Sequence, residues 1–232
     1  MAKIRSFPEF FRKYGYILIA AAWCVTVAII VDRYWAPESS LSLVHKRVSQ
    51  SVKESEEDFS RLTADTALLK KAISGNYDQK FIKSLTRKKY FLFFYSEDEN
   101  GEKELQTWNT QKVLPSPALL YLEGKSGFSL LQNGYYVWNN FEAPGIKVLA
   151  LIPVKWNYFV TNDYLKNDFA ASPNTQDAFE LKAGQSEGEV VSSIHGKELF
   201  RIAKKTDQPE QKNNSISVLL YILATVIFLF FI

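Results

Sequence analysis

The 232-residue sequence predicts an α+β protein in which a long helix precedes an antiparallel sheet, with one apolar helix near each end of the chain. Three observations lead to this class. Apolar residues recur at helical spacing over 41–73, several short apolar strands with tight turns follow, and uncharged apolar segments lie near both termini. No helix of crossover length clearly separates the strands, so we expect antiparallel pairing.

The charge of the chain is concentrated at its beginning. The formal net charge is +3, and the first 13 residues account for all of it through Lys3, Arg5, Arg12 and Lys13 against Glu9. A nucleic-acid-binding protein needs a concentrated basic surface, which the neutral remainder does not supply. We therefore expect no nucleic-acid partner. The length suits one domain of ordinary size between the two apolar segments.

The first apolar segment, 14–35, is predicted to be a transmembrane helix because 14–31 contains no charged residue. Basic residues precede it, so the positive-inside rule places 1–13 in the cytoplasm and the central domain on the other side of the membrane. A cleaved signal peptide is the alternative. The apolar run is longer than a signal peptide requires, however, and no small-x-small cleavage site follows it.

The last segment, 216–232, is uncharged throughout and is predicted to be the second transmembrane helix. A helix of this length reaches roughly 25 Å, somewhat less than the roughly 30 Å of a hydrocarbon core. We interpret it as either a minimal anchor or a truncated helix. The polar stretch 207–215, which contains Pro209, is predicted to be a linker.

A helical stalk is predicted over 36–86, with a helix start at Pro37–Ser40 and a further short helix over 79–85. Its apolar stripe fits two arrangements equally well: packing on its own domain, or forming the seam of a dimer. A neighbouring acidic run is expected to be a solvated face. The stripe comprises Leu41, Val44, Val48, Val52, Phe59, Leu62, Leu69 and Ile73, with Ser55 and Thr66 as polar members; the acidic run comprises Glu54, Glu56, Glu57 and Asp58.

The region 87–206 is predicted to hold the sheet. Its clearest signal is Asn133-Gly134, the dipeptide typical of a two-residue hairpin turn. Residues 118–122 fit either a strand or a helical turn. The expected strands are 90–95, 104–108, 128–132 paired with 135–139, 146–152 closed by Pro153, and 190–194 paired with 197–203 across His195-Gly196.

The sequence contains no recognisable catalytic motif. Its two histidines, His45 and His195, are far apart in sequence and form no metal-binding or catalytic spacing, and Cys24 is the only cysteine. We therefore predict no catalytic residues, no metal site and no cofactor. A ligand pocket is the remaining possibility, although each aromatic ring would serve a core equally well. The candidate ligand-binding residues are Trp108, Tyr136, Trp138, Asn139, Asn140, Trp156 and Asn162.

Several of these segments together resemble a known family. They are the strand 91–95 followed by Trp108-Asn109, the hairpin 131–136, the run 149–169 and the late 196–200. Within the run, the matching residues are Ile152, Pro153, Tyr158, Asn162, Tyr164, Leu165 and Phe169. This pattern is similar to the periplasmic sensor region of sensor histidine kinases from Bacteroidetes.

The resemblance implies a PAS-like or Cache-like sensor domain in the periplasm, held by two helices in the bacterial inner membrane. It also implies a homodimer that responds to a periplasmic small-molecule or protein signal. The output would be a two-component histidine kinase located after the second membrane helix and absent from this chain. The alternative from a different class is a non-enzymatic envelope tether or assembly protein with two membrane anchors.

Overall fold

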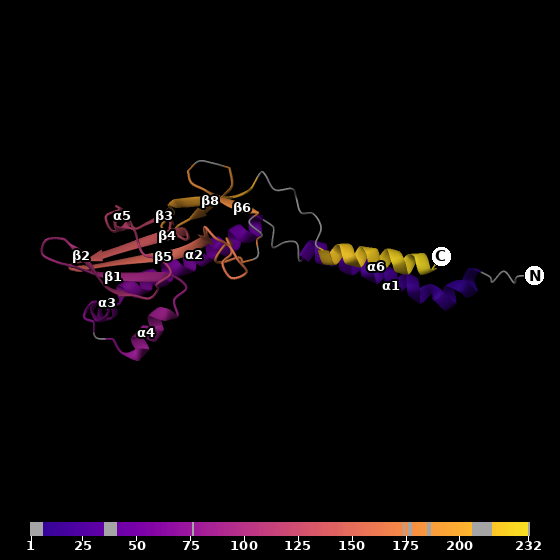
Figure 1. Cartoon of the computed structure of the whole chain (residues 1–232), viewed down its shortest axis with the longest axis horizontal. Helices are drawn as coiled ribbons and strands as arrows, with labels where there is room; N and C mark the ends of the chain where they lie inside the picture. Colours follow the sequence, from indigo (N-terminus) through magenta and orange to yellow (C-terminus); the bar gives the residue numbers. More distant parts are fainter. Residues whose placement is uncertain are drawn as a thin grey trace, which may run out of the picture. The chain divides into compact units, whose positions relative to one another are not determined.

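The computed structural model describes residues 7–34, 41–75, 77–173, 175, 178–184, 187–205 and 215–231. The chain divides into two compact units. The helical unit comprises 1–40 with 206–232, and the sheet unit comprises 41–205 (Figure 1). The predicted linker 207–215 lies outside the described residues except for Ser215, and so does the predicted start of the stalk, 36–40.

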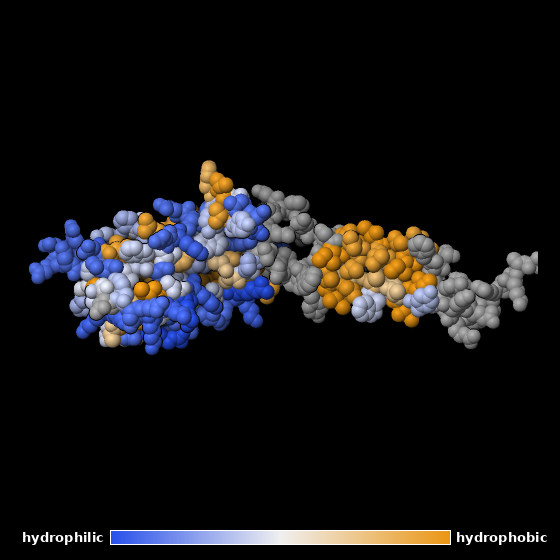
Figure 2. All heavy atoms as spheres, turned by 60° about the horizontal axis from the view of Figure 1, so that its bottom comes forward, coloured by the Kyte–Doolittle hydropathy of each residue, from blue (hydrophilic) through white to orange (hydrophobic). Residues whose placement is uncertain are grey.

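The helical unit consists of α1 (Phe7–Tyr34) and α6 (Ser215–Phe231), which pack side by side (Figure 1). Small residues are buried on both helices, and small side chains allow two helices to approach closely. They are Ala21 and Ala28 on α1, and Ser217 and Ala224 on α6. The visible face of the pair is largely hydrophobic, whereas the visible face of the sheet unit is mostly hydrophilic (Figure 2).

The prediction of two transmembrane helices is wrong. Across the ranges that the structure describes, none of the helices combines the length and the apolar character needed to cross a membrane. The shortfall in length is plain for α6, whose 17 residues rise only about 25 Å. In α1, charged residues occupy both ends. The inner-membrane location and periplasmic placement rested on these helices, and they are withdrawn with them.

The sheet unit contains two antiparallel sheets. The larger has the strand order β2-β1-β5-β4-β3 and the smaller β6-β8-β7, and all neighbouring strands pair antiparallel. The α+β class is therefore observed. The strands are β1 (Phe91–Glu97), β2 (Lys103–Trp108), β3 (Ser126–Leu131), β4 (Gly134–Ala143), β5 (Ile146–Trp156), β6 (Phe179–Lys182), β7 (Glu189–Ser192) and β8 (Glu198–Lys204).

Helix α2 (Leu41–Ala64) covers one face of the larger sheet and also contacts the smaller one. Its apolar stripe is buried against Leu92, Phe94 and Ile152 of the larger sheet and Phe200 of the smaller. The two arrangements left open by the sequence are thereby distinguished, because the stripe packs on its own domain. The buried α2 members of the stripe are Val44, Val48, Val52, Ser55, Phe59 and Leu62.

The predicted continuous helix over 41–73 is interrupted at one residue. α2 ends at Ala64, and α3 (Thr66–Ile73) begins after Asp65, whose side chain accepts a hydrogen bond from the amide of Leu68. An aspartate that caps the next helix ends the preceding one, because its backbone is extended. Asp78 caps α4 (Gln79–Thr86) in the same way, which confirms the short helix predicted at 79–85.

The opposite face of the larger sheet is also buried. Phe93, Tyr136, Trp138 and Leu149 pack there under the segment that connects β2 to β3. That segment contains α5 (Pro117–Leu120), so the ambiguous stretch 118–122 begins as a helical turn. Burial on both faces explains why β1 is an uninterrupted apolar run.

Strand β5 continues four residues beyond its predicted end at Ile152. Pro153 lies opposite Tyr136, and the register then shifts so that Lys155 lies opposite Tyr135, leaving Val154 as an extra residue. Bulges are among the few places where a strand accepts proline. On the other side of β5, pairing with β1 stops at Leu151, so Pro153 faces no β1 partner.

The Asn133-Gly134 hairpin is confirmed, with its turn one residue earlier than predicted, since Leu131 pairs with Gly134. The sequence suggested that Gly134 shapes the turn, but the structure requires a glycine there because the backbone of β5 lies so close. A Cβ atom there would lie 2.6 Å from the carbonyl oxygen of Lys155 on β5. The second predicted hairpin, β7–β8, is also confirmed, whereas β6 was not predicted.

Candidate functional site

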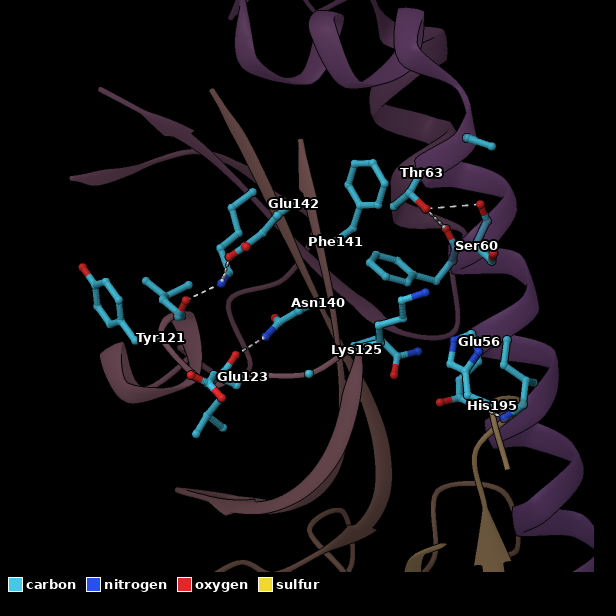
Figure 3. Close-up of a pocket in the computed structure, with 18 of the residues that line it drawn as sticks. Glu56, Ser60, Thr63, Tyr121, Glu123, Lys125, Asn140, Phe141, Glu142 and His195 are labelled. Carbon is cyan, nitrogen blue, oxygen red and sulfur yellow. Dashed lines mark hydrogen bonds and ion pairs between the residues drawn. The ribbon is translucent and has the colours of Figure 1, made fainter. Parts of the chain in front are cut away.

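A groove of about 850 Å³ opens between the C-terminal half of α2, the end of β4 and the loop that precedes β3 (Figure 3). A second wall segment comes from the β7–β8 turn. The lining residues from α2 are Glu56, Phe59, Ser60, Thr63 and Ala64; those from the strands are Lys103, Asn139, Asn140, Phe141, Glu142 and Lys147; those from α5 and the loops are Leu120 to Lys125, Ile194 and His195.

The α2 wall is anchored by a buried carboxylate. Glu56 is only 1% exposed. It accepts hydrogen bonds from the Ser193 hydroxyl (2.8 Å) and the Ile194 amide (2.7 Å). Ser193 also receives a bond of 3.2 Å from the hydroxyl of Ser126 on β3. Because buried polar groups are costly when unpaired, this network fixes α2 against both sheets.

Asn139 and Asn140, two of the predicted site residues, lie next to each other on β4 at this groove. Asn139 is buried, and with its amide nitrogen turned toward the acceptors it donates to Glu56 Oε1 (3.1 Å) and to the Trp138 carbonyl (2.9 Å). Among the described residues, the side chain of Asn140 makes only long contacts, of 3.5 Å from its Nδ2 to the carbonyls of Leu119 and Leu122. Its Oδ1 is buried and lacks a donor among the described residues.

A buried lysine forms the floor on the β5 side. Lys147 is 2% exposed and donates to the Leu120 carbonyl and to the carboxylate of Glu142. The hydrogen bond from Lys147 holds the pKa of Glu142 below its ordinary value, with the charges of Lys147 and Lys103 adding to the effect against the opposing influence of burial. The carboxylate of Glu142 therefore stays ionised near neutrality.

Among the described residues, no side-chain hydrogen bond or ion pair is found for Ser60, Glu123, Lys125 and His195 of the groove, all of them exposed. The ring of Phe141 lies between the α2 side and the loop side of the groove (Figure 3), and Phe59 of α2 also lines it. The lining contains three carboxylates and three ammonium groups, so it carries little net charge. This composition suits a small molecule with polar groups and an apolar face better than a polyphosphate.

The structure separates the remaining predicted site residues. Tyr136 and Trp138 belong to the core on the other face of the sheet. Trp108 is exposed at the end of β2. Trp156 lines a second hollow, and Asn162 caps a turn by accepting from the amides of Tyr164 and Leu165. Only Asn139 and Asn140 come together in the groove.

Sequence reasoning missed Glu56 and Lys147 as site residues. Glu56 was included in the acidic run expected to face solvent, and that interpretation is wrong for this residue. It lies four residues after Val52 and three before Phe59, a spacing that places it beside the apolar stripe. For Lys147 the signal was weaker, because it stands at an ordinary alternating position of β5.

In the described part of the chain, no group of three or more His, Cys, Asp or Glu residues is arranged to hold a metal ion. Comparison of the chain with family models, with curated proteins and with solved structures finds no match in any of the three. The PAS-like or Cache-like class and the kinase resemblance therefore remain predictions.

Proposed function

We propose that this chain is a signal-sensing input module that binds a small molecule in the groove beside α2. The observation that carries the proposal is that α2 is itself a wall of the groove, held there by the buried Glu56 network. A ligand in the groove contacts the same helix that would transmit its effect. The resemblance to sensor histidine kinases supports a two-component kinase as the output.

The mechanism follows from differential binding. A ligand that prefers one position of α2 shifts the population toward that position, by no more than its difference in affinity for the two states. Glu56, Asn139 and Ser193 connect α2 to β4 and to the β7–β8 turn. A ligand that competes for these hydrogen bonds loosens α2, and one that adds to them tightens it.

The experiment is a thermal-shift screen of the full chain against small polar metabolites, because a molecule that binds only the folded state raises the melting temperature. A hit is then tested on two α2 variants. Ser60→Trp fills the groove, whereas Glu57→Trp places the same ring at an exposed α2 position outside the lining.

We expect the shift to be lost in Ser60→Trp and kept in Glu57→Trp. Amide hydrogen exchange with the bound hit should change in α2 and in the 193–197 turn. A hit that shifts both variants equally binds elsewhere and would count against the groove. A hit that protects the groove but leaves α2 exchange unchanged would count against the sensing mechanism.

A further inference from the structure

The loop that follows β5, residues 157–167, presents apolar side chains to solvent. Phe159 is completely exposed, and Tyr164 is 94% exposed. Val160 and Leu165 are exposed as well. Isolated apolar residues on a surface need no explanation, but four within seven positions form a patch of the kind that marks an interaction site.

Hydrogen bonds within this loop fix its conformation. At its base, Asn167 Oδ1 accepts from the Tyr158 amide (2.7 Å). At its tip, Asn162 Oδ1 accepts from the amides of Tyr164 and Leu165, both at 2.8 Å. The apolar side chains are thus displayed by a built turn, which lowers the entropic cost of binding a partner.

A hollow of about 620 Å³ lies beside the same loop. Its wall contains the rings of Trp156, Tyr158 and Tyr164, and its lining includes the buried ring of Phe169. Charged residues of both signs also line it: Lys112, Lys166, Asp163 and Asp168. We call this cavity the loop hollow, and Phe159 with Val160 the loop tip.

We propose that a second copy of this chain occupies the loop hollow, with the loop tip of each copy seated in the hollow of its partner. A two-fold dimer uses the same patch on both copies, so such a patch must be complementary to itself. This one carries both an exposed apolar tip and a hollow lined in part by aromatic rings. Its rim also carries both signs of charge, which a two-fold axis can pair.

The position of α2 strengthens this assignment. The stripe that the sequence offered as a possible dimer seam is buried on the sheets of its own chain. Self-association through α2 would require that helix to leave its own core. Association through the loop requires no such change, because the tip is already exposed.

The first test measures self-association of the full chain by sedimentation equilibrium, with Phe159→Asp compared against Ile82→Asp. Ile82 of α4 is also an exposed apolar residue but lies outside both the groove and the loop hollow. We expect the parent and Ile82→Asp to dimerise alike, and Phe159→Asp to raise the dissociation constant by roughly tenfold or more. A monomeric parent, or equal association of both variants, would overturn the proposal.

The second test examines reciprocity. Ala170 is exposed and lines the loop hollow, so Ala170→Trp should fill the hollow while leaving the tip intact. Phe159→Asp and Ala170→Trp are each expected to associate weakly alone. A mixture should associate more tightly than either, because the intact tip of one chain meets the intact hollow of the other. A mixture no tighter than its components would overturn the reciprocal arrangement.

Discussion

The carboxylate of Asp58 on α2 accepts a hydrogen bond of 2.8 Å from the hydroxyl of Tyr90 and one of 2.6 Å from the ammonium group of Lys88. Burial alone would raise the pKa of Asp58. The bonds from Lys88 and Tyr90, with the charges of Lys88 and Arg61, hold it below its ordinary value of 3.8. Burial, together with the bond to Asp58, raises the pKa of the Tyr90 hydroxyl, which therefore remains a donor.

This arrangement predicts a specific acid sensitivity. Because the pKa of Asp58 is lower in the folded state, its stabilising contribution is complete above the unfolded value and is lost as the pH falls through the folded value. Asp58→Asn should lower the free energy of unfolding near neutrality by about 1 kcal/mol, a figure reduced for its partial exposure. Urea titrations should show this difference disappearing in acid. A difference that persists unchanged in acid would exclude the carboxylate as its source.

The Glu56 network predicts a large difference between adjacent acidic residues. Glu56→Ala would leave the Ser193 hydroxyl and the Ile194 amide without their acceptor in a buried site. It should reduce the free energy of unfolding by about 2–4 kcal/mol. Glu57→Ala, at an exposed position one residue later, should change it by less than about 0.5 kcal/mol. Equal effects of the two substitutions in chemical denaturation would contradict the network.

His45 provides a second connection between α2 and the smaller sheet. Its Nδ1 lies 2.9 Å from Glu189 Oε2, and its Nε2 lies 2.8 Å from the Val190 carbonyl oxygen. A double-mutant cycle of His45→Ala and Glu189→Ala should give a coupling of about 0.5–1 kcal/mol. The control cycle pairs His45 with Glu57, which is about 18 Å away along the helix axis. That cycle should give no coupling. A comparable coupling energy in both cycles would mean that the His45–Glu189 value does not come from their direct contact.

The glycines predict different costs for the same substitution. Gly134→Ala should lower the free energy of unfolding by about 1–3 kcal/mol, because the new methyl group meets the backbone of β5. Gly145 has φ +73° in open space, so Gly145→Ala should cost only about 1 kcal/mol from backbone strain. Thermal unfolding of the two variants measures the difference. A loss of stability for Gly134→Ala smaller than that for Gly145→Ala would mean that the backbone of β5 can move to accommodate the methyl group.

The sequence was most informative where one local interaction decides the outcome. The apolar run of β1 and the turn near Gly134 were predicted because burial and turn geometry are read from adjacent residues. Helix α2 was predicted from its spacing, but the surface that covers it was not. The spacing of the stripe shows that this face of α2 must be buried. It does not show which strands cover it, and these include strands as far along the chain as β8.

The candidate site was harder to predict for the same reason. Asn139 and Asn140 were identified, but strand alternation turns only Asn139 toward α2, whereas Asn140 lies on the face that carries Trp138. Glu56 joins the site only because the β7–β8 turn, some 137 residues later, supplies its donors. The two apolar ends of the chain predicted transmembrane helices because they lack charge, but α6 has only 17 residues.

The end of β5 has a further consequence for the loop that follows it. The Trp156 amide donates to the Asp168 carbonyl, and the Ala170 amide donates to the Val154 carbonyl, so 168–170 returns alongside the strand. Both ends of the loop are thereby joined to the sheet. The entropic cost of closing such a loop grows slowly with its length. Residues can therefore be inserted or exchanged between these anchors with little effect on the core, which makes this loop the natural place for recognition to diversify on an unchanged scaffold.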